Sequence, residues 1–130
     1  MIVETKTKRI ICTAHAEGSC HDFQLYESSI GNAVSDEIKI LGDSGYQGIH
    51  RLHKSSETPK KKPKGGMLTV EEKAENRRIS RERILIENIN AKVKVFKIVA
   101  NKYRNRRRRF GLRMSVICGI INYELGSRYA

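Results

Sequence analysis

The chain has 130 residues, a length that suits one domain. Its 26 Lys and Arg residues outnumber 14 Asp and Glu residues, and the formal net charge of +12 favours a polyanionic partner. Three scattered cysteines argue against a disulfide framework or a zinc site and fit the reducing cytoplasm, and no apolar run approaches the about 18 residues of a membrane helix.

The first part of the chain predicts strands around one helix. The β-branched start of residues 9–17 (RIICTAHAE) indicates a strand, and residues 1–8 are expected to pair with it through a tight turn at residues 5–8. Residues 21–31 have apolar side chains at helical spacing before Gly31, with Asp22 capping or charging the first turn. Residues 36–43 (DEIKILGD) predict a buried strand that contains Ile38 and Ile40.

The second part predicts mostly helices. Residues 48–57 suggest a short helix, and the lysine- and proline-rich residues 58–66 suggest a loop or an edge strand. Thr69 and Glu72 form a capping box, and Ser80 with Arg83 is expected to restart the helix after a break. Two apolar stripes follow, one for each long helix: Ile79, Ile86, Ile89, Val93 and Phe96, then Phe110, Met114, Ile117, Ile121 and Leu125. This order of elements predicts an α/β class with helices packed on a small sheet.

Asp43 ends the third predicted strand, within the stretch ILGDSGYQGI. Ligands of open α/β sheets bind beyond the carboxyl ends of the strands, and Gly45 lets the backbone turn sharply there. An aspartate before Ser-Gly also commonly caps a turn, so these residues alone leave both interpretations open.

Arg83, Glu87 and Lys94 are spaced by four and seven residues, which places all three on one face of a helix. A carboxylate between two cations suits metal and phosphate chemistry. The alternative is an ordinary surface ladder of ion pairs, which the spacing alone favours.

The motifs DSGYQGI, RILIENINAKVK and KYRNRRRRFGLRMSVICGIINYEL, in this order, resemble the C-terminal catalytic region of bacterial insertion-sequence transposases, closest to the insertion-sequence-four/five superfamily. Arg83, Glu87 and Lys94 match the family's helix signature of arginine, three residues, glutamate, six residues and lysine. Ser80 stands where the family often has tyrosine. GSCHDFQL resembles the family's Gly-x-x-His-Asp segment, so His21 and Asp22 are candidates for site support.

The resemblance implies an RNase H-like DDE fold in which two aspartates and a glutamate hold divalent ions, normally Mg²⁺ or else Mn²⁺. Asp43 would be the second catalytic and metal-binding acid and Glu87 the third, while Arg83 and Lys94 would contact DNA. It implies cleavage and joining of DNA strands at the ends of an insertion sequence, in a bacterial cytoplasm and near the nucleoid. The expected partners are DNA and either a homo-oligomer or a full-length transposase, with no membrane.

The family's first aspartate, in an Asp-Gly-Thr or Asp-Ala-Thr setting, is expected before residue 1, and neither Glu4 nor Asp22 matches that setting. The chain is therefore expected to be the N-terminally truncated tail of a transposase, inactive alone, because a two-metal site needs a bridging carboxylate. The alternative function is a small, basic, non-catalytic DNA-binding protein that interferes with a full-length transposase.

Three segments are expected: residues 1–56 with the second aspartate, a basic loop at 57–67, and a helical part at 68–130.

His50 and His53 are three residues apart and could share a metal, but no third ligand is evident. The clustered cations predict DNA contacts, with solvated surface as the alternative. These cations are Lys60, Lys61, Lys62, Arg104, Arg106, Arg107, Arg108 and Arg109.

Overall fold

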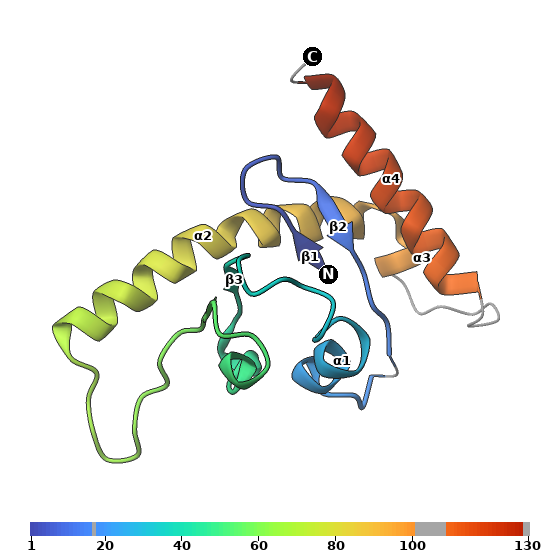
Figure 1. Cartoon of the computed structure of the whole chain (residues 1–130). Coiled ribbons are helices and arrows are strands. Elements are labelled where there is room, and N and C mark those ends of the chain that lie inside the picture. Colours follow the sequence, from blue (N-terminus) through green and yellow to red (C-terminus); the bar gives the residue numbers. More distant parts are fainter. Residues whose placement is uncertain (17, 101–108, 129–130) are drawn as a thin grey trace. The chain divides into compact units, whose positions relative to one another are not determined.

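The computed structural model describes residues 1–16, 18–100 and 109–128. It divides into two compact units (Figure 1). The terminal unit combines Met1–His15 with Ile84–Ala130, and the middle unit is Ala16–Arg83. Both contain short strands and helices, so the predicted mixed α/β class is confirmed. No described helix is long and apolar enough to cross a membrane.

The terminal unit begins with a hairpin of β1 (Ile2–Val3) and β2 (Ile10–Cys12), which pair antiparallel. The turn closes through backbone hydrogen bonds of 2.9 Å from Glu4 N to Arg9 O and from Lys8 N to Glu4 O. Lys8 has a φ of 63°, the left-handed conformation that such a turn needs. The predicted hairpin is confirmed, but a strand over residues 9–17 is wrong because β2 ends at Cys12.

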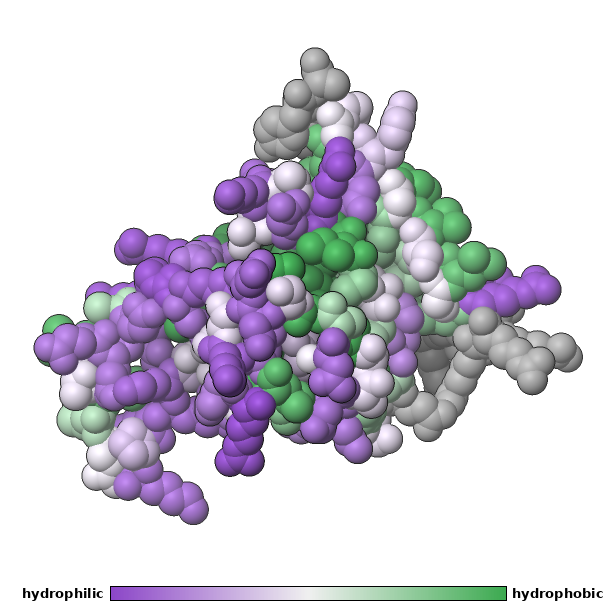
Figure 2. All heavy atoms as spheres, viewed as in Figure 1, coloured by the Kyte–Doolittle hydropathy of each residue, from purple (hydrophilic) through white to green (hydrophobic). Residues whose placement is uncertain are grey.

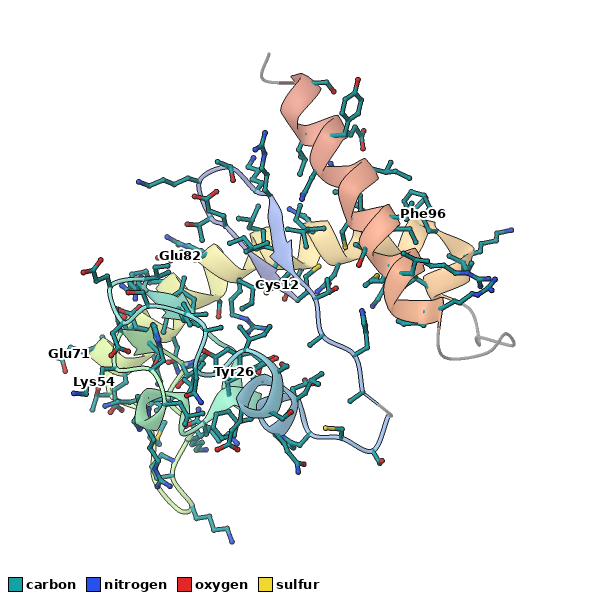
Figure 3. All side chains as sticks on the ribbon, turned by 45° about the vertical axis from the view of Figure 1, so that its right-hand side comes forward. Cys12, Tyr26, Lys54, Glu71, Glu82 and Phe96 are labelled. Carbon is teal, nitrogen blue, oxygen red and sulfur yellow. The ribbon has the colours of Figure 1, made fainter. Side chains whose placement is uncertain are left out.

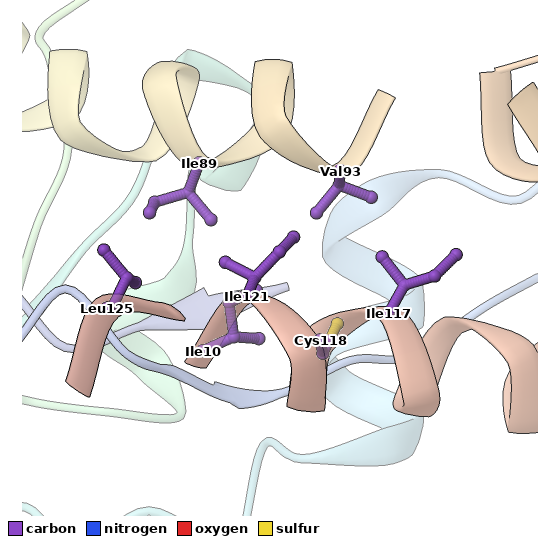
Figure 4. Close-up of a cluster of buried hydrophobic side chains, with 7 residues drawn as sticks. All are labelled: Ile10, Ile89, Val93, Ile117, Cys118, Ile121 and Leu125. Atoms are coloured by element: carbon purple, nitrogen blue, oxygen red, sulfur yellow. The ribbon is translucent and has the colours of Figure 1, made fainter. Parts of the chain in front are cut away.

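The core of the terminal unit lies between the end of α2 (Val70–Val95), β2 and α4 (Phe110–Arg128) (Figure 4). A short helix, α3 (Lys97–Ala100), follows α2. Asn122 of α4 clamps the hairpin, because its Oδ1 accepts from Ile10 N at 2.8 Å and its Nδ2 donates to Ile10 O at 2.9 Å. The core side chains are Ile10, Ile89, Val93, Ile117, Cys118, Ile121 and Leu125. The two predicted apolar stripes are confirmed in part, since five of their residues lie in this core, and Phe96 and Met114 pack against it. Ile79 is buried in the middle unit instead.

The middle unit contains α1 (Asp22–Ser29), β3 (Ile40–Leu41), β4 (Ser56–Glu57) and the 3₁₀ turns η1 (Ser44–Tyr46) and η2 (Ile49–Arg51). β3 and β4 pair in parallel, with Ile40 opposite Ser56. The predicted strand at 36–43 is therefore only two residues long, and the prediction that Ile38 is buried is wrong. Ile38 is 56% exposed because it lies in the turn before β3, where its amide bonds to Ser35 O.

Helix α2 starts at the predicted capping box. Thr69 N donates to Glu72 Oε2 at 3.0 Å, and Glu72 N donates to Thr69 Oγ1 at 3.1 Å. The predicted break at Ser80 is wrong, since α2 is continuous and residues 70–95 contain neither glycine nor proline. Residues 58–69 form a loop, which confirms one of the two predicted alternatives.

Candidate functional site

Asp43 follows β3 and caps η1. Its Oδ1 accepts a hydrogen bond of 2.7 Å from the backbone N–H of Gly45. A Cβ at position 45 would lie 2.9 Å from the same oxygen, so any other residue there would displace the Asp43 carboxylate. The turn-capping interpretation of Asp43 is therefore confirmed, and the cap holds the carboxylate in a fixed position at the end of a parallel strand.

The second oxygen of Asp43 faces α2. Oδ2 lies 3.6 Å from Nη2 of Arg83, within ion-pair range, and both side chains are partly exposed, at 39% and 28%. This contact connects the DSGY motif to the helix that carries the Arg-x₃-Glu-x₆-Lys signature. Sequence spacing alone had given no partner for Asp43.

Glu87 and Lys94 follow Arg83 on the same continuous helix, and both are exposed. Glu87 is four residues after Arg83, which is about one turn along the same face. Asp43 belongs to the middle unit and Glu87 to the terminal unit. Metal binding and catalysis by these two residues remain predictions.

Tyr46 is a residue of this region that sequence reasoning did not select. Burial raises the pKa of its phenol, and the negative charges of Asp22 and Asp43 raise that pKa further. Its ring meets that of Tyr26 edge to face, with centroids 6.3 Å apart. Tyr26 is on α1 and is labelled in Figure 3. The carboxylates of Asp22 and Asp43 therefore both lie close enough to Tyr46 to raise the pKa of its phenol. The available signal was its place in DSGY, three residues after the predicted acid.

His21 is the N-cap of α1, where Nδ1 accepts from Phe23 N at 3.4 Å, and Asp22 lies exposed in the first turn. The interpretation of Asp22 as a first-turn charge is therefore confirmed, whereas the capping side chain is that of His21. A supporting role of either residue in the site stays a prediction.

A metal shared by His50 and His53, which the sequence left open without a third ligand, finds no support among the described residues. His53 is completely buried, with Nε2 at 2.5 Å from the carbonyl oxygen of Ile38 and Nδ1 at 3.6 Å from Oδ1 of Asp36. His50 is exposed. His53 thus packs in the interior of the middle unit.

The predicted DNA-binding cations differ in their surroundings. Lys60 is held by α2, since Nζ lies 2.9 Å from Oε1 of Glu72 and the carboxamide of Asn76 bonds both to Lys60 N and to Lys60 O. The Lys60 ammonium, together with the Thr69 amide, lowers the pKa of Glu72. Lys61, Lys62 and Arg109 are exposed. Arg104, Arg106, Arg107 and Arg108 lie outside the described residues.

Comparison with known proteins identifies the family. Residues 1–122 match the family model described as DDE superfamily endonuclease. The chain belongs to this family. It is 50% identical over 125 residues to the probable transposase for insertion sequence element IS702 of Microchaete diplosiphon, a match that covers 96% of this chain and 45% of that protein. The chain thus spans less than half the length of this relative, and no solved structure matches. The predicted resemblance to insertion-sequence DDE transposases is confirmed.

Members of a DDE family generally use divalent metal, and the two matched acids fit it chemically. Asp43 and Glu87 offer carboxylate oxygens, the hard donors that Mg²⁺ and Mn²⁺ prefer. Asp43 is partly exposed, and each oxygen keeps coordination capacity beyond its one contact. Within the described ranges, no three His, Cys, Asp or Glu side chains are grouped so that they could hold an ion.

Proposed function

We propose that this chain is part of the catalytic domain of an insertion-sequence DDE transposase with an RNase H-like fold. The complete domain would cleave and join DNA strands at the ends of an insertion sequence, in the bacterial cytoplasm near the nucleoid. Within it, Asp43 serves as the second catalytic acid and Glu87 as the third. The expected segments, with the second acid in 1–56, the basic loop in 57–67 and the third acid in 68–130, belong to this proposal.

The ion pair between Arg83 and Asp43 carries the proposal. It joins two motifs that are forty residues apart in the sequence and that the family uses in one site. Surface ion pairs of this length contribute little stability, so the contact supports the proposal through the two motifs that it brings together and not through its energy. Glu87 comes next on the helix that provides Arg83.

Each matched residue receives a role from its chemistry. The carboxylates of Asp43 and Glu87 would hold Mg²⁺ or Mn²⁺, which polarises a phosphoryl oxygen when bound. Arg83 orients the Asp43 carboxylate and, with Lys94, binds phosphate oxygens of DNA. The exposed Lys61, Lys62 and Arg109, together with Lys60, Arg104, Arg106, Arg107 and Arg108, add contacts to the DNA backbone.

We also propose that residues 1–130 alone do not cleave DNA, because two matched positions supply only two of the three acids of the family site. The first aspartate of that site would come from a further segment or from a partner transposase chain. Incubation of the purified chain with supercoiled plasmid and Mg²⁺ tests this point, and nicking that disappears in Asp43→Asn would contradict it.

Titration of Mn²⁺ followed by electron paramagnetic resonance tests the metal role. We expect Asp43→Asn and Glu87→Gln each to weaken Mn²⁺ binding at least about tenfold, the scale lost when an outer partner of a metal site is removed. Glu37→Gln is the matched control, since Glu37 is an exposed carboxylate of the middle unit outside both motifs.

The opposite outcome defines the alternative function. If all three variants bind Mn²⁺ as the original chain does, and DNA binding persists in Asp43→Asn and Glu87→Gln, then the chain acts as a basic DNA-binding protein without a metal site. Such a protein could still interfere with a full-length transposase by competing for its DNA.

A further inference from the structure

Three cations recur along the first half of α2. Lys73, Arg77 and Arg81 are four residues apart, all are exposed, and all belong to the middle unit. A step of four residues turns an α-helix by about 40°, so the three side chains share a sector of about 80°. None of them belongs to the Arg-x₃-Glu-x₆-Lys signature.

Two acids of this half of α2, Glu75 and Glu82, pair with Arg78. Its Nη1 lies 2.6 Å from Oε1 of Glu82, and its Nη2 lies 2.6 Å from Oε1 of Glu75. Nη2 also bonds to Glu57 of β4. Hydrogen bonds to Glu75 and Glu57 raise the pKa of the Arg78 guanidinium further above its usual range.

The remaining pairing completes the separation of charge. Glu72 binds Lys60, and Glu57 binds Lys39 with Oε1 at 2.6 Å from Nζ. Among the residues that the structure describes, no carboxylate pairs with Lys73, Arg77 or Arg81. Mostly hydrophilic side chains cover the part of the molecule where α2 begins, although Met67 and Val70 are exposed there (Figure 2). These three positive charges therefore remain available to an external anion.

The dimensions suit a nucleic-acid backbone. Each four-residue step rises about 6 Å, so the three cations span about 12 Å along the helix. Duplex DNA carries one negative charge per about 1.7 Å of its axis, which provides several phosphates within that length. Arg77 and Arg81 also line a shallow hollow of about 480 Å³ with Ala74, Arg78 and Glu82, large enough for a phosphate group.

We propose that Lys73, Arg77 and Arg81 form a phosphate-binding track for duplex DNA, distinct from the predicted contacts at Arg83 and Lys94. Arg78 is its positioning residue, because it pairs with the carboxylates of Glu75 and Glu82, which would otherwise repel a bound phosphate. The exposed Lys61, Lys62 and Lys64 lie on the loop that Lys60 fastens to α2, so the same unit presents both sets of cations. This inference rests on the proposed function, since it requires the chain to bind DNA.

The test measures the affinity for a fluorescent 20-base-pair duplex at several salt concentrations. The variant Lys73→Gln, Arg77→Gln, Arg81→Gln is compared with the matched control Lys6→Gln, Lys8→Gln, Lys97→Gln, which removes equal charge from the terminal unit. The salt slope is the slope of log affinity against log salt concentration, and each lost phosphate contact lowers its magnitude by about 0.9. The slope of the track variant should therefore fall by about 2.7, and its binding at ~0.1 M salt should be at least about tenfold weaker. The salt slope of the control variant should fall by less than about 1. Circular dichroism and thermal unfolding confirm that both variants fold.

Equal losses in the two variants would overturn the track, because they would reflect net charge alone. An unchanged slope in the track variant would overturn it too, while leaving the proposed function intact. If the original chain binds no duplex, the proposed function and the track both fail. An Arg78→Gln variant adds a separate readout: its salt slope should fall although Lys73, Arg77 and Arg81 are all retained.

Discussion

The terminal and middle units are stabilised by different forces. The terminal unit buries a cluster that is apolar throughout, from Ile10 on β2 to Leu125 on α4. The middle unit buries few large apolar side chains (Tyr26, Ile49 and Ile79), and among them lies the fully buried His53. Its elements are connected instead by polar contacts, in which Arg78 and Glu57 are central. Apolar burial depends little on pH and salt, whereas ion pairs depend on both, so the two units should respond differently to the same conditions.

The largest effect is expected in the terminal core. Ile121 is 2% exposed, and Ile121→Ala should lower the free energy of unfolding by about 3–4 kcal/mol through lost burial and a residual cavity. The neighbouring Ile120 is 50% exposed, so Ile120→Ala should cost less than about 1 kcal/mol. Chemical denaturation followed by circular dichroism measures both. Similar losses would show that this face of α4 is not the buried one.

The next effect concerns the buried histidine of the middle unit. His53→Ala should cost about 2–3 kcal/mol, because it leaves a cavity and deprives the Ile38 carbonyl of its partner. His50→Ala, at an exposed position nearby, should change the stability by no more than about 0.5 kcal/mol. Native-state hydrogen exchange locates the change. Loss of protection in α4 before α1 would contradict the separation of the units.

A smaller effect is expected at the start of α2. Thr69→Ala removes the oxygen that caps Glu72 N and should cost about 1 kcal/mol. Ser80→Ala should be neutral or stabilising by a few tenths of a kcal/mol, since Ser80 is exposed in a continuous helix and alanine has the higher helix propensity. Equal destabilisation by the two substitutions, measured by urea denaturation, would restore the idea of a second helix start at Ser80.

The smallest effect is the pH response that distinguishes the units. Lys39 and Arg78 lower the pKa of Glu57, and Arg78 lowers that of Glu75, both below the ordinary 4.5. Their stabilisation is therefore present above about pH 4.5 and is lost as the pH falls through the lowered values. NMR should show the ring signals of Tyr26 and Tyr46 broadening at a higher pH than the methyl signals of Ile117 and Ile121. In Glu57→Gln this difference should shrink, and simultaneous loss of both sets would refute the comparison.

Features that depend on neighbouring residues were predicted correctly from the sequence. The capping box of Thr69 and Glu72, the hairpin at the N-terminus and the buried face of α4 all follow from spacings within one element or one turn. The order of DSGY and the Arg-x₃-Glu-x₆-Lys helix was sufficient to indicate the family. Within the site, the sequence identified Asp43 and its turn but not the neighbouring Tyr46.

The two errors in the strands arose where distant contacts decided the outcome, whereas the break expected at Ser80 was a local error. Alternation of Ile38 and Ile40 predicted a buried strand, yet only residues 40 and 41 pair with β4, and Ile38 instead offers its carbonyl to His53. The β-branched run after Arg9 did not extend β2 beyond Cys12, because β1 is only two residues long and provides no further partners.

The sequence by itself determined the family, the start of α2, the buried face of α4 and the two candidate acids, because each depends on residue identity and short-range spacing. Only the tertiary structure decided that Arg83 faces Asp43, that Arg78 gathers Glu57, Glu75 and Glu82, and that Lys60 is held by Glu72. Opposite charges attract at any sequence separation, so a chain with 26 cations and 14 acids permits many pairings. The fold selects among them by bringing particular side chains within 4 Å, and that selection leaves Lys73, Arg77 and Arg81 facing outward.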